Sequence, residues 1–196
     1  MVNTDNMMKS PLPLDEDTIV QRIGTSLTDG DIARYFGDGA ESKILKYSEL
    51  ANYRHIDELL PKERDFRVIL VEHENNQGHW CCIMKYNKTI EWFNPYGVRP
   101  DGQKNLLGKI RNQMLGQAED YMTNLMKSSK GYKLIYNKAR LQKLRQGINT
   151  CGRWIILRII CMKDMMMDLK MFNKMIKDTQ KATGLPNDAL VAIWIG

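Results

Sequence analysis

The sequence predicts an α+β fold in which a central, mostly antiparallel sheet packs against a buried helix. Three observations favour this class: β-branched runs follow one another in mid-chain, segments of helical period flank them, and one late segment is apolar on nearly every side. With 196 residues, 43% of them apolar, the chain can close one sizeable core. We therefore expect a single domain over residues 15–196, after a flexible N-terminal arm over residues 1–14.

Two short helices are expected in the N-terminal part of the chain. Thr28 and Asp31 have the spacing of a helix cap and its acidic third position. Gly37 can end such a helix, so the first spans residues 29–36. The second lies near residues 48–53.

The middle of the chain predicts strands in quick succession. Residues 66–71 are apolar and β-branched, as in a buried strand, and the polar residues 74–78 after them indicate a turn. The expected strands 80–86 and 89–93 have two residues between them, which is the spacing of a tight hairpin.

The second half of the chain predicts more helix than strand. Residues 104–127 repeat apolar side chains at helical spacing and predict one long amphipathic helix, and residues 132–136 return to a strand. Amphipathic helices near residues 169–176 and 188–194 would close the fold. Residues 151–160 are apolar nearly all round, so periodicity alone suits a buried helix and a buried strand equally.

Composition limits the class of protein. The net charge of +6 favours contact with polyanions, and a basic run includes Lys138, Arg140, Lys143 and Arg145. That run can contact nucleic acid, or it can be an ordinary solvated surface. The start of the chain lacks a secretory signal, and no segment is long and apolar enough for a bilayer span, so we expect a soluble intracellular protein without a membrane partner.

Cys151 is the candidate nucleophile. A thiol becomes reactive when its pKa is lowered. A helix N-terminus beside an imidazole lowers that pKa in two ways, through the helix dipole and through ion pairing with the imidazole. If residues 155–160 are helical, Cys151 lies at such an N-terminus, with Thr150 as a capping-type residue before it and Gly152 leaving room for substrate.

The same helix start would supply half of an oxyanion hole through the backbone N–H of Cys151. A side-chain amide would complete it. Gln146 lies five positions upstream and Gln142 nine, and both are candidates.

His79 is the candidate general base. The chain has two other histidines, His55 in a charged stretch and His73 between two glutamates, and both are expected at the solvated surface. Asn94 would orient His79, because antiparallel pairing brings the two ends of the hairpin together on one side of the sheet. Glu91 is the rival acceptor.

The remaining cysteines predict no metal site. Cys81 and Cys82 follow His79 closely, but alternation along a strand points them to opposite faces. Cys161 is expected in the core. The four cysteines have no disulfide-type spacing, which favours a reducing compartment.

Taken together, these segments resemble the adenovirus protease (adenain) pattern, in a clan that also contains the SUMO-specific proteases. The resemblance covers roughly residues 65–160 and rests on Gly-His-Trp at 78–80, Phe-Asn-Pro-Tyr-Gly at 93–97, Gln146, and Thr-Cys-Gly-Arg-Trp at 150–154. The order His, acidic or amide residue, Gln, Cys differs from the papain order. It implies a cysteine peptidase with His79, Asn94 and Cys151 as the triad and Gln146 as the oxyanion donor.

Two departures from that pattern stand out. The clan usually has Glu or Asp where Asn94 stands, so stabilisation of the imidazolium should be weaker here. The spacing from Gln to Cys is usually slightly longer than five, which keeps Gln142 a candidate.

Within the clan, the chain looks most like the maturation proteases of virophages and related double-stranded DNA viruses. By that resemblance its substrates are capsid or core precursor proteins, cut next to glycine or other small residues, in the virion and at the assembly site in the host cytoplasm. No cofactor is required for the chemistry, but the resemblance implies that DNA can act as a cofactor; activation by a peptide is also open. The alternatives are a SUMO-type deconjugating protease and a non-catalytic basic protein of a particle, in which Cys151 is a buried small hydrophobe.

Overall fold

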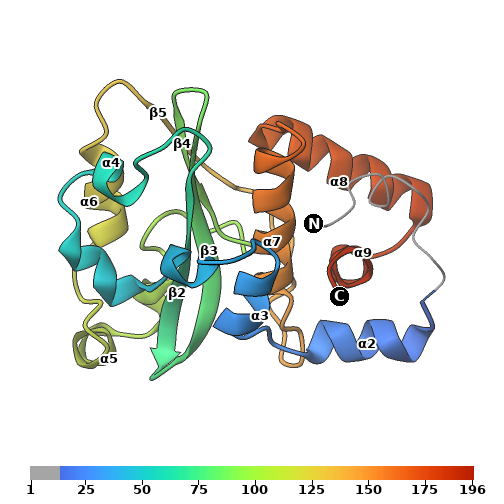
Figure 1. Cartoon of the computed structure of the whole chain (residues 1–196). Helices are drawn as coiled ribbons and strands as arrows, with labels where there is room; N and C mark the ends of the chain where they lie inside the picture. Colours follow the sequence, from blue (N-terminus) through green and yellow to red (C-terminus); the bar gives the residue numbers. More distant parts are fainter. Residues whose placement is uncertain (1–13) are drawn as a thin grey trace. The chain divides into compact units, whose positions relative to one another are not determined.

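The computed structural model describes residues 14–196 and has a mixed α+β fold with one five-stranded sheet (Figure 1). The chain divides into two compact units. One is Ser42–Lys138, and the other joins the described residues up to Glu41 with Ala139–Gly196. The single domain over 15–196 stays a prediction, and residues 1–13 of the expected arm lie outside the described residues.

The sheet belongs to the unit Ser42–Lys138, and its strands follow each other in sequence order. They are β1 (Ile44–Lys46), β2 (Phe66–Glu74), β3 (Gln77–Tyr86), β4 (Thr89–Phe93) and β5 (Lys133–Tyr136). The three central strands pair antiparallel, whereas β1 and β5 run parallel to their neighbours. Antiparallel pairing therefore forms the middle of the sheet, and a long crossover connects β4 to β5.

The predicted hairpin of β3 and β4 is confirmed. Tyr86 lies opposite Thr89, and Asn87 and Lys88 between them both have positive φ, at 46° and 55°. Two residues of positive φ form the turn whose twist matches that of the flanking strands.

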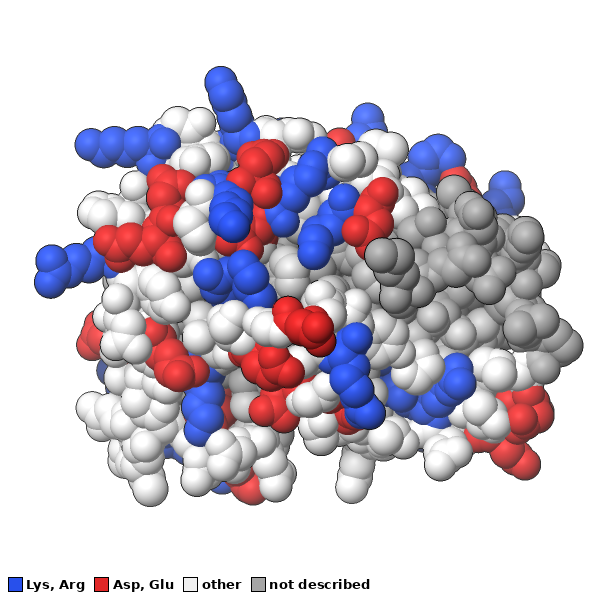
Figure 2. Space-filling model, in the orientation of Figure 1, with Lys and Arg blue, Asp and Glu red and all other residues white. Residues whose placement is uncertain are grey.

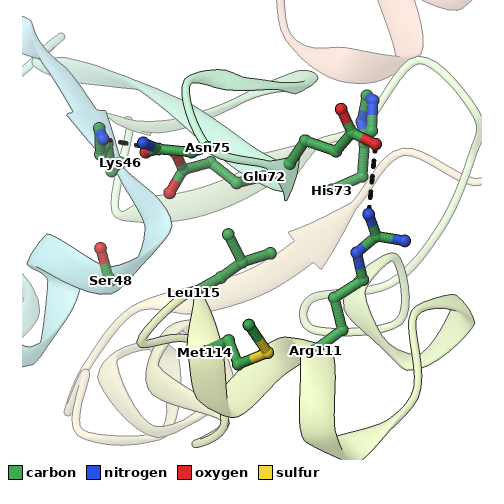
Figure 3. Close-up of a pocket in the computed structure, with 9 residues that line it drawn as sticks. Lys46, Ser48, Glu72, His73, Asn75, Arg111, Met114 and Leu115 are labelled. Atoms are coloured by element: carbon green, nitrogen blue, oxygen red, sulfur yellow. Dashed lines mark hydrogen bonds and ion pairs between the residues drawn. The ribbon is translucent and has the colours of Figure 1, made fainter.

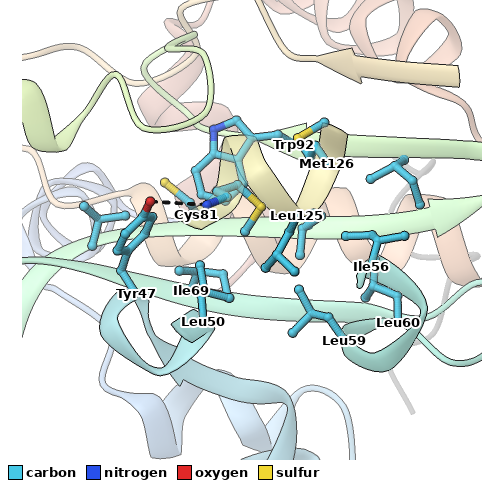
Figure 4. Close-up of a cluster of buried hydrophobic side chains, with 14 residues drawn as sticks. Tyr47, Leu50, Ile56, Leu59, Leu60, Ile69, Cys81, Trp92, Leu125 and Met126 are labelled. Atoms are coloured by element: carbon cyan, nitrogen blue, oxygen red, sulfur yellow. Dashed lines mark hydrogen bonds between the residues drawn. The ribbon is translucent and has the colours of Figure 1, made fainter. Parts of the chain in front are cut away.

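The core of this unit lies on one face of the sheet (Figure 4). Alternate residues of the central strands contribute to it, namely Ile69, Val71, Cys81, Ile83, Ile90 and Trp92. The 3-10 helix η2 (Tyr47–Asn52), α4 (Ile56–Leu59) and α6 (Tyr121–Lys127) add further apolar side chains. The helix expected near 48–53 is thus present as a 3-10 helix.

The single long helix expected over residues 104–127 is wrong. The segment is broken into η3 (Lys104–Leu106), α5 (Lys109–Met114) and α6. Gly108 and Gly116 have φ of 76° and 68°, values outside the range of a right-handed helix. Leu106, Ile110 and Met114, read as part of an inner stripe, are instead 72%, 76% and 82% exposed.

The other unit is helical. It contains α2 (Glu16–Gly24), α3 (Asp29–Arg34), α7 (Cys151–Lys163), α8 (Leu169–Thr183) and α9 (Asn187–Trp194). The predicted cap of α3 is present as a reciprocal pair between Thr28 and Asp31. Helix α2 was not predicted, and it packs against α9.

Helix α7 resolves the ambiguity of residues 151–160. The segment is an α-helix that begins at Cys151, and its residues from Gly152 to Met162 are buried. A helix buried on all sides has no polar face, which explains why periodicity could not identify it. Among the described residues, no helix combines the length and apolarity that a bilayer span needs.

Candidate active site

His79 and Asn94 are brought together by the register of the hairpin. Cys82 lies opposite Phe93, so the next position places Asn94 beside Cys81, two residues along the strand from His79. Side chains in this diagonal relation share a face of the sheet and can touch. His79 Nε2 lies 2.9 Å from Asn94 Oδ1, and both residues are buried.

A second hydrogen bond settles which ring nitrogen carries the proton. The backbone N–H of Tyr96 donates to the same Oδ1 over 2.9 Å. An N–H group can only donate, so Oδ1 is an acceptor and His79 Nε2 must donate its proton to it. Nδ1 of the neutral ring then carries the lone pair and is the basic nitrogen.

Two residues that the sequence did not single out complete this arrangement. The ring of Tyr96 stacks on that of His79, with centroids 4.1 Å apart and planes within 10°. Asn137 is buried and donates from Nδ2 to the backbone carbonyl of Asn94 over 3.2 Å. Tyr96 lies in the Phe-Asn-Pro-Tyr-Gly block and could have been named from it; Asn137 follows β5 and carries no sequence signal.

Gly78 allows the backbones of β2 and β3 to come close to each other beside His79. A Cβ at Gly78 would lie 2.2 Å from the carbonyl oxygen of Val71, which is closer than any real contact. The strands would have to separate to accept a larger residue.

The electrostatics of His79 favour the neutral ring. Burial lowers the pKa of His79 to about 4, the hydrogen bond to Asn94 raises it, and the charge of His73 lowers it further. A carboxylate in place of Asn94 would favour the imidazolium, whereas the amide does so weakly. At neutral pH His79 is therefore an unprotonated base.

The alternatives to His79 and Asn94 are placed elsewhere. His55 and His73 are exposed, as predicted. His73 lines a pocket of about 560 Å³ where Arg111 pairs with Glu74 (Figure 3). Glu91 lies opposite Met84 near the turn of the hairpin and accepts a hydrogen bond from the Tyr86 hydroxyl.

Cys151 differs from the other cysteines in exposure. Cys81, Cys82 and Cys161 are buried, whereas Cys151 is partly exposed at the first position of α7. Burial raises the pKa of the Cys161 thiol to about 12. Cys151 is thus the cysteine whose position suits a reactive thiolate.

The loop before Cys151 is held by distant segments of its own unit. Asn149 donates from its backbone N–H to Ile23 O over 2.8 Å and from Nδ2 to Gly24 O over 2.7 Å. Thr150 precedes the helix as expected, but its side chain makes no capping bond. Its hydroxyl donates to the buried carboxylate of Asp188, at Oδ1, over 2.6 Å.

The two glutamines have different surroundings. Gln142 is buried, and its Nε2 donates to Ile148 O over 2.9 Å, which closes the loop that leads to Cys151. Gln146 is exposed on that loop. The assignment of either as oxyanion donor stays a prediction.

The structure also bears on the cysteines and on the basic run among the described residues. No group of three or more metal-ligating side chains occurs among residues 14–196, and Cys81 belongs to the core. The basic residues Lys138, Arg140, Lys143 and Arg145 are exposed. On the face drawn in Figure 2, basic and acidic side chains of the described residues are interspersed.

The sequence is similar to a virophage protein. The sequence is 32% identical over 169 residues to the uncharacterized protein V9 of Sputnik virophage, covering 86% of this chain and 93% of V9. No protein-family model matches. Solved structures of the SUMO protease Ulp1, with its catalytic cysteine oxidized to a sulfinic or sulfenic acid, align over 94% and 95% of this chain and 96% and 97% of theirs, with TM-scores of 0.40 and identities of 14% and 15%.

Proposed function

The chain belongs to the family of protein V9 of Sputnik virophage, and we propose that it is a viral cysteine endopeptidase with Cys151 as nucleophile, His79 as base and Asn94 as the residue that orients the base. The observation that carries the proposal is the hydrogen bond between His79 Nε2 and Asn94 Oδ1, from which the tautomer of His79 follows. A buried imidazole whose Nε2–H is held by an amide, leaving Nδ1 basic, is what a thiol protease requires of its base.

The position of Cys151 supports the same proposal. It begins a buried helix, whose dipole favours a thiolate. Structural cysteines are usually buried like Cys81 and Cys161, and Cys151 is not.

The reaction proposed is acyl transfer. The Cys151 sulfur attacks the peptide carbonyl while its proton passes to His79 Nδ1, and His79 returns that proton to the leaving amine. Water, deprotonated by His79, then releases the acyl group and regenerates the thiol. The Cys151 N–H and the amide of Gln146 or Gln142 hold the oxyanion.

The substrates proposed are capsid or core precursors of the virus, cut beside glycine or other small residues in the virion and at the cytoplasmic assembly site. The V9 relative comes from a virophage, which supports a viral role. No cofactor is needed for the chemistry. The exposed basic residues can contact the phosphates of DNA, which supports activation by DNA.

The test is cleavage of co-expressed glycine-containing virion precursor proteins, read as new termini by mass spectrometry. Wild type should cut, and Cys151→Ala and His79→Gln should not. Cys161→Ala is the matched control, since that thiol is buried and should be dispensable for cleavage.

SUMO and ubiquitin fusions belong in the same panel. Cleavage of those fusions alone would replace the virion role by deconjugation. Absence of all cleavage, with a Cys151 thiol that also resists alkylation, would leave a non-catalytic basic particle protein.

A further inference from the structure

A pocket lies at the end of the sheet where the hairpin of β2 and β3 carries His79 (Figure 3). Its wall includes Glu72 and His73 of β2, and its volume of about 560 Å³ is typical of ligand sites. Glu72 pairs with Gly78 in the strand register, so this wall begins one residue along and one strand across from His79. Those steps are about 3.3 Å and about 5 Å. The pocket therefore adjoins the proposed base within one unit.

Strand β2 is irregular at this wall. The register with β3 shifts between Glu72 and Glu74, so that no residue of β3 is paired with His73. A bulge of this kind turns a side chain out of the alternation of its strand, and His73 lines the pocket. His73 is also near enough to His79 for its charge to lower the pKa of that ring. The bulge thus places a pocket residue beside the base.

Helix α5 and Leu115 after it form the facing wall (Figure 3). Ile110 and Met114 lie four residues apart, and so on one side of α5, and both are largely exposed. We call this side the outward face of α5. Arg111 and Met114 line both the pocket and a second hollow of about 660 Å³ along α5. Single exposed apolar side chains are ordinary, but a group of them beside a pocket is typical of a binding surface.

Buried amides fix α5 to the sheet, so its outward face does not belong to a loose segment. Gln117 donates from Nε2 to Glu72 O over 2.7 Å and to Asn112 Oδ1 over 3.1 Å. Asn112 donates from Nδ2 to Lys104 O over 2.8 Å and to Gly108 O over 3.0 Å. Gln117 and Asn112 are both buried, where such hydrogen bonds hold a segment firmly. The pocket is therefore preformed.

The charge left to be paired on this surface is positive. Glu72 is buried and already pairs with Lys46 over 3.4 Å. Glu74 and Arg111 pair over 3.2 Å, but both are exposed, so this ion pair is weak and can be exchanged for another. Lys109 is exposed, lines the second hollow and forms no ion pair with a described residue. This balance favours an acidic partner.

We propose that the pocket and the outward face of α5 form a docking site for a segment of the protein substrate that is rich in apolar and acidic side chains. The inference rests on the proposed function and adds to it a specificity site next to the base. An apolar side chain of the substrate lies against Met114 and Leu115, and a carboxylate pairs with Arg111 or Lys109. The docking site binds substrate and takes no part in the chemical step.

The probe is a fluorescein-labelled peptide, Leu-Glu-Leu-Glu-Ala-Gly-Gly-Ala-Glu-Leu-Glu-Leu, whose central glycines are the expected point of cleavage. A second peptide has lysine at each glutamate, and a third has alanine at each leucine. Each is titrated with the full chain carrying Cys151→Ala, and binding is measured by fluorescence anisotropy. The first peptide should bind with a Kd of about 10 to 100 µM, and the other two at least about tenfold more weakly.

Two substitutions on α5, added to Cys151→Ala, test the docking site. Met114→Gln removes apolar contact and should weaken binding of the first peptide about threefold to tenfold. Arg111→Glu should weaken it about tenfold and should make the lysine peptide the tighter ligand. Both side chains are exposed, so the fold should be unaffected. A reversed preference is also a result that a folding defect does not produce.

Met166→Gln and Lys177→Glu are the matched controls, because both side chains are exposed in the other unit and line neither hollow. They should leave the Kd unchanged. The inference is overturned if the first peptide does not bind, or if Met114→Gln and Arg111→Glu bind it as tightly as their parent. Dimerisation in sedimentation velocity that Met114→Gln abolishes would also overturn it, since the face would then belong to a second copy of this chain.

Binding and cleavage can fail separately. Cleavage of the first peptide by wild type, with a kcat/KM that Met114→Gln and Arg111→Glu leave unchanged, would keep the protease and refute the docking site. Binding that depends on Met114 and Arg111, without cleavage by wild type of any substrate in the panel, would keep the docking site and refute the protease.

Discussion

The segment that holds the proposed base and the segment that holds the proposed nucleophile are built in different ways. His79 and Asn94 are joined by a bond that spans 15 residues, within one hairpin whose turn and register fix both ends. The segment around Cys151 depends on bonds to Gly24 and Thr25, which are 125 and 128 residues away from their partners. The base is positioned by local strand pairing, and the nucleophile by contacts between remote parts of the chain.

The largest expected effect concerns the charge of the base. His79 has a pKa of about 4 in the folded chain, below the value of about 6.5 expected when unfolded. Between these values the unfolded chain binds a proton that the folded chain refuses, so stability present above pH 6.5 is lost as the pH falls towards 4. The loss attributable to His79 should approach about 3 kcal/mol.

Denaturant unfolding of wild type and His79→Gln at pH 7, 6, 5 and 4 measures this loss. The contribution of His79 is the difference between the free energies of unfolding of the two proteins at each pH. Carboxylates with lowered pKa act in both proteins and cancel in that difference. His55→Gln, at an exposed position, should keep the wild-type slope. Asn94→Asp should shrink the slope because a carboxylate raises the pKa of His79; identical slopes in wild type and His79→Gln would refute the buried neutral imidazole.

The next effect tests the segment of the nucleophile. Asp188→Ala removes the acceptor of the Thr150 hydroxyl and of the Lys143 N–H, and the buried Thr150 hydroxyl is left without that partner. The free energy of unfolding should fall by about 2 kcal/mol. Thermal or denaturant unfolding measures this loss of stability. The rate at which Cys151 is alkylated should also change in the same variant.

Asp188→Asn keeps an acceptor oxygen and should lose less than Asp188→Ala. Equal losses in the two variants would show that the charge of Asp188, not its hydrogen bonds, supports the loop.

A smaller effect is expected at Asn137, which fixes the backbone of Asn94. Asn137→Ala should reduce the free energy of unfolding by about 1 to 1.5 kcal/mol, because one buried hydrogen bond is lost. Cleavage should fall severalfold as Asn94 becomes less well held. Asn124→Ala, at an exposed position of the same unit, should change stability by less than about 0.5 kcal/mol.

The smallest effect is expected from the ring stacked on the base. Tyr96→Leu keeps the backbone N–H that binds Asn94 but loses the stack, for about 0.5 to 1 kcal/mol. Proton NMR of the His79 ring should show loss of the ring-current shift of Tyr96. An unchanged His79 resonance would mean that the rings do not stack in solution.

How much could be predicted from the sequence also differs between the segment of the base and the segment of the nucleophile. The hairpin, its turn and the pairing of His79 with Asn94 come from alternation and turn spacing, which are local. The start of α7 at Cys151 was predicted from the helix N-terminus that a reactive thiol needs, and not from periodicity. Tyr96 and Asn137 escaped notice because their roles arise from packing and from the parallel placement of β5 beside β4.

The errors have physical causes as well. Residues 104–127 have helical spacing, but Gly108 and Gly116 adopt positive φ and interrupt the helix there. Thr150 has the chemistry of a cap, yet its side chain makes no capping bond, and its hydroxyl donates to Asp188, which is distant in sequence. The predicted exposure of His55 and His73 was confirmed, since both lie in charged stretches.

The remote bonds around Cys151 also set an order in time during synthesis. Every residue of the base hairpin has been made once synthesis has passed Asn94, and local pairing can form on a microsecond scale. The partners Asp188 and Ile195 are translated some 40 residues after Thr150 and Arg153, several seconds later at ordinary elongation rates. A nascent chain therefore carries its cysteine for some time before the surroundings that hold it are complete.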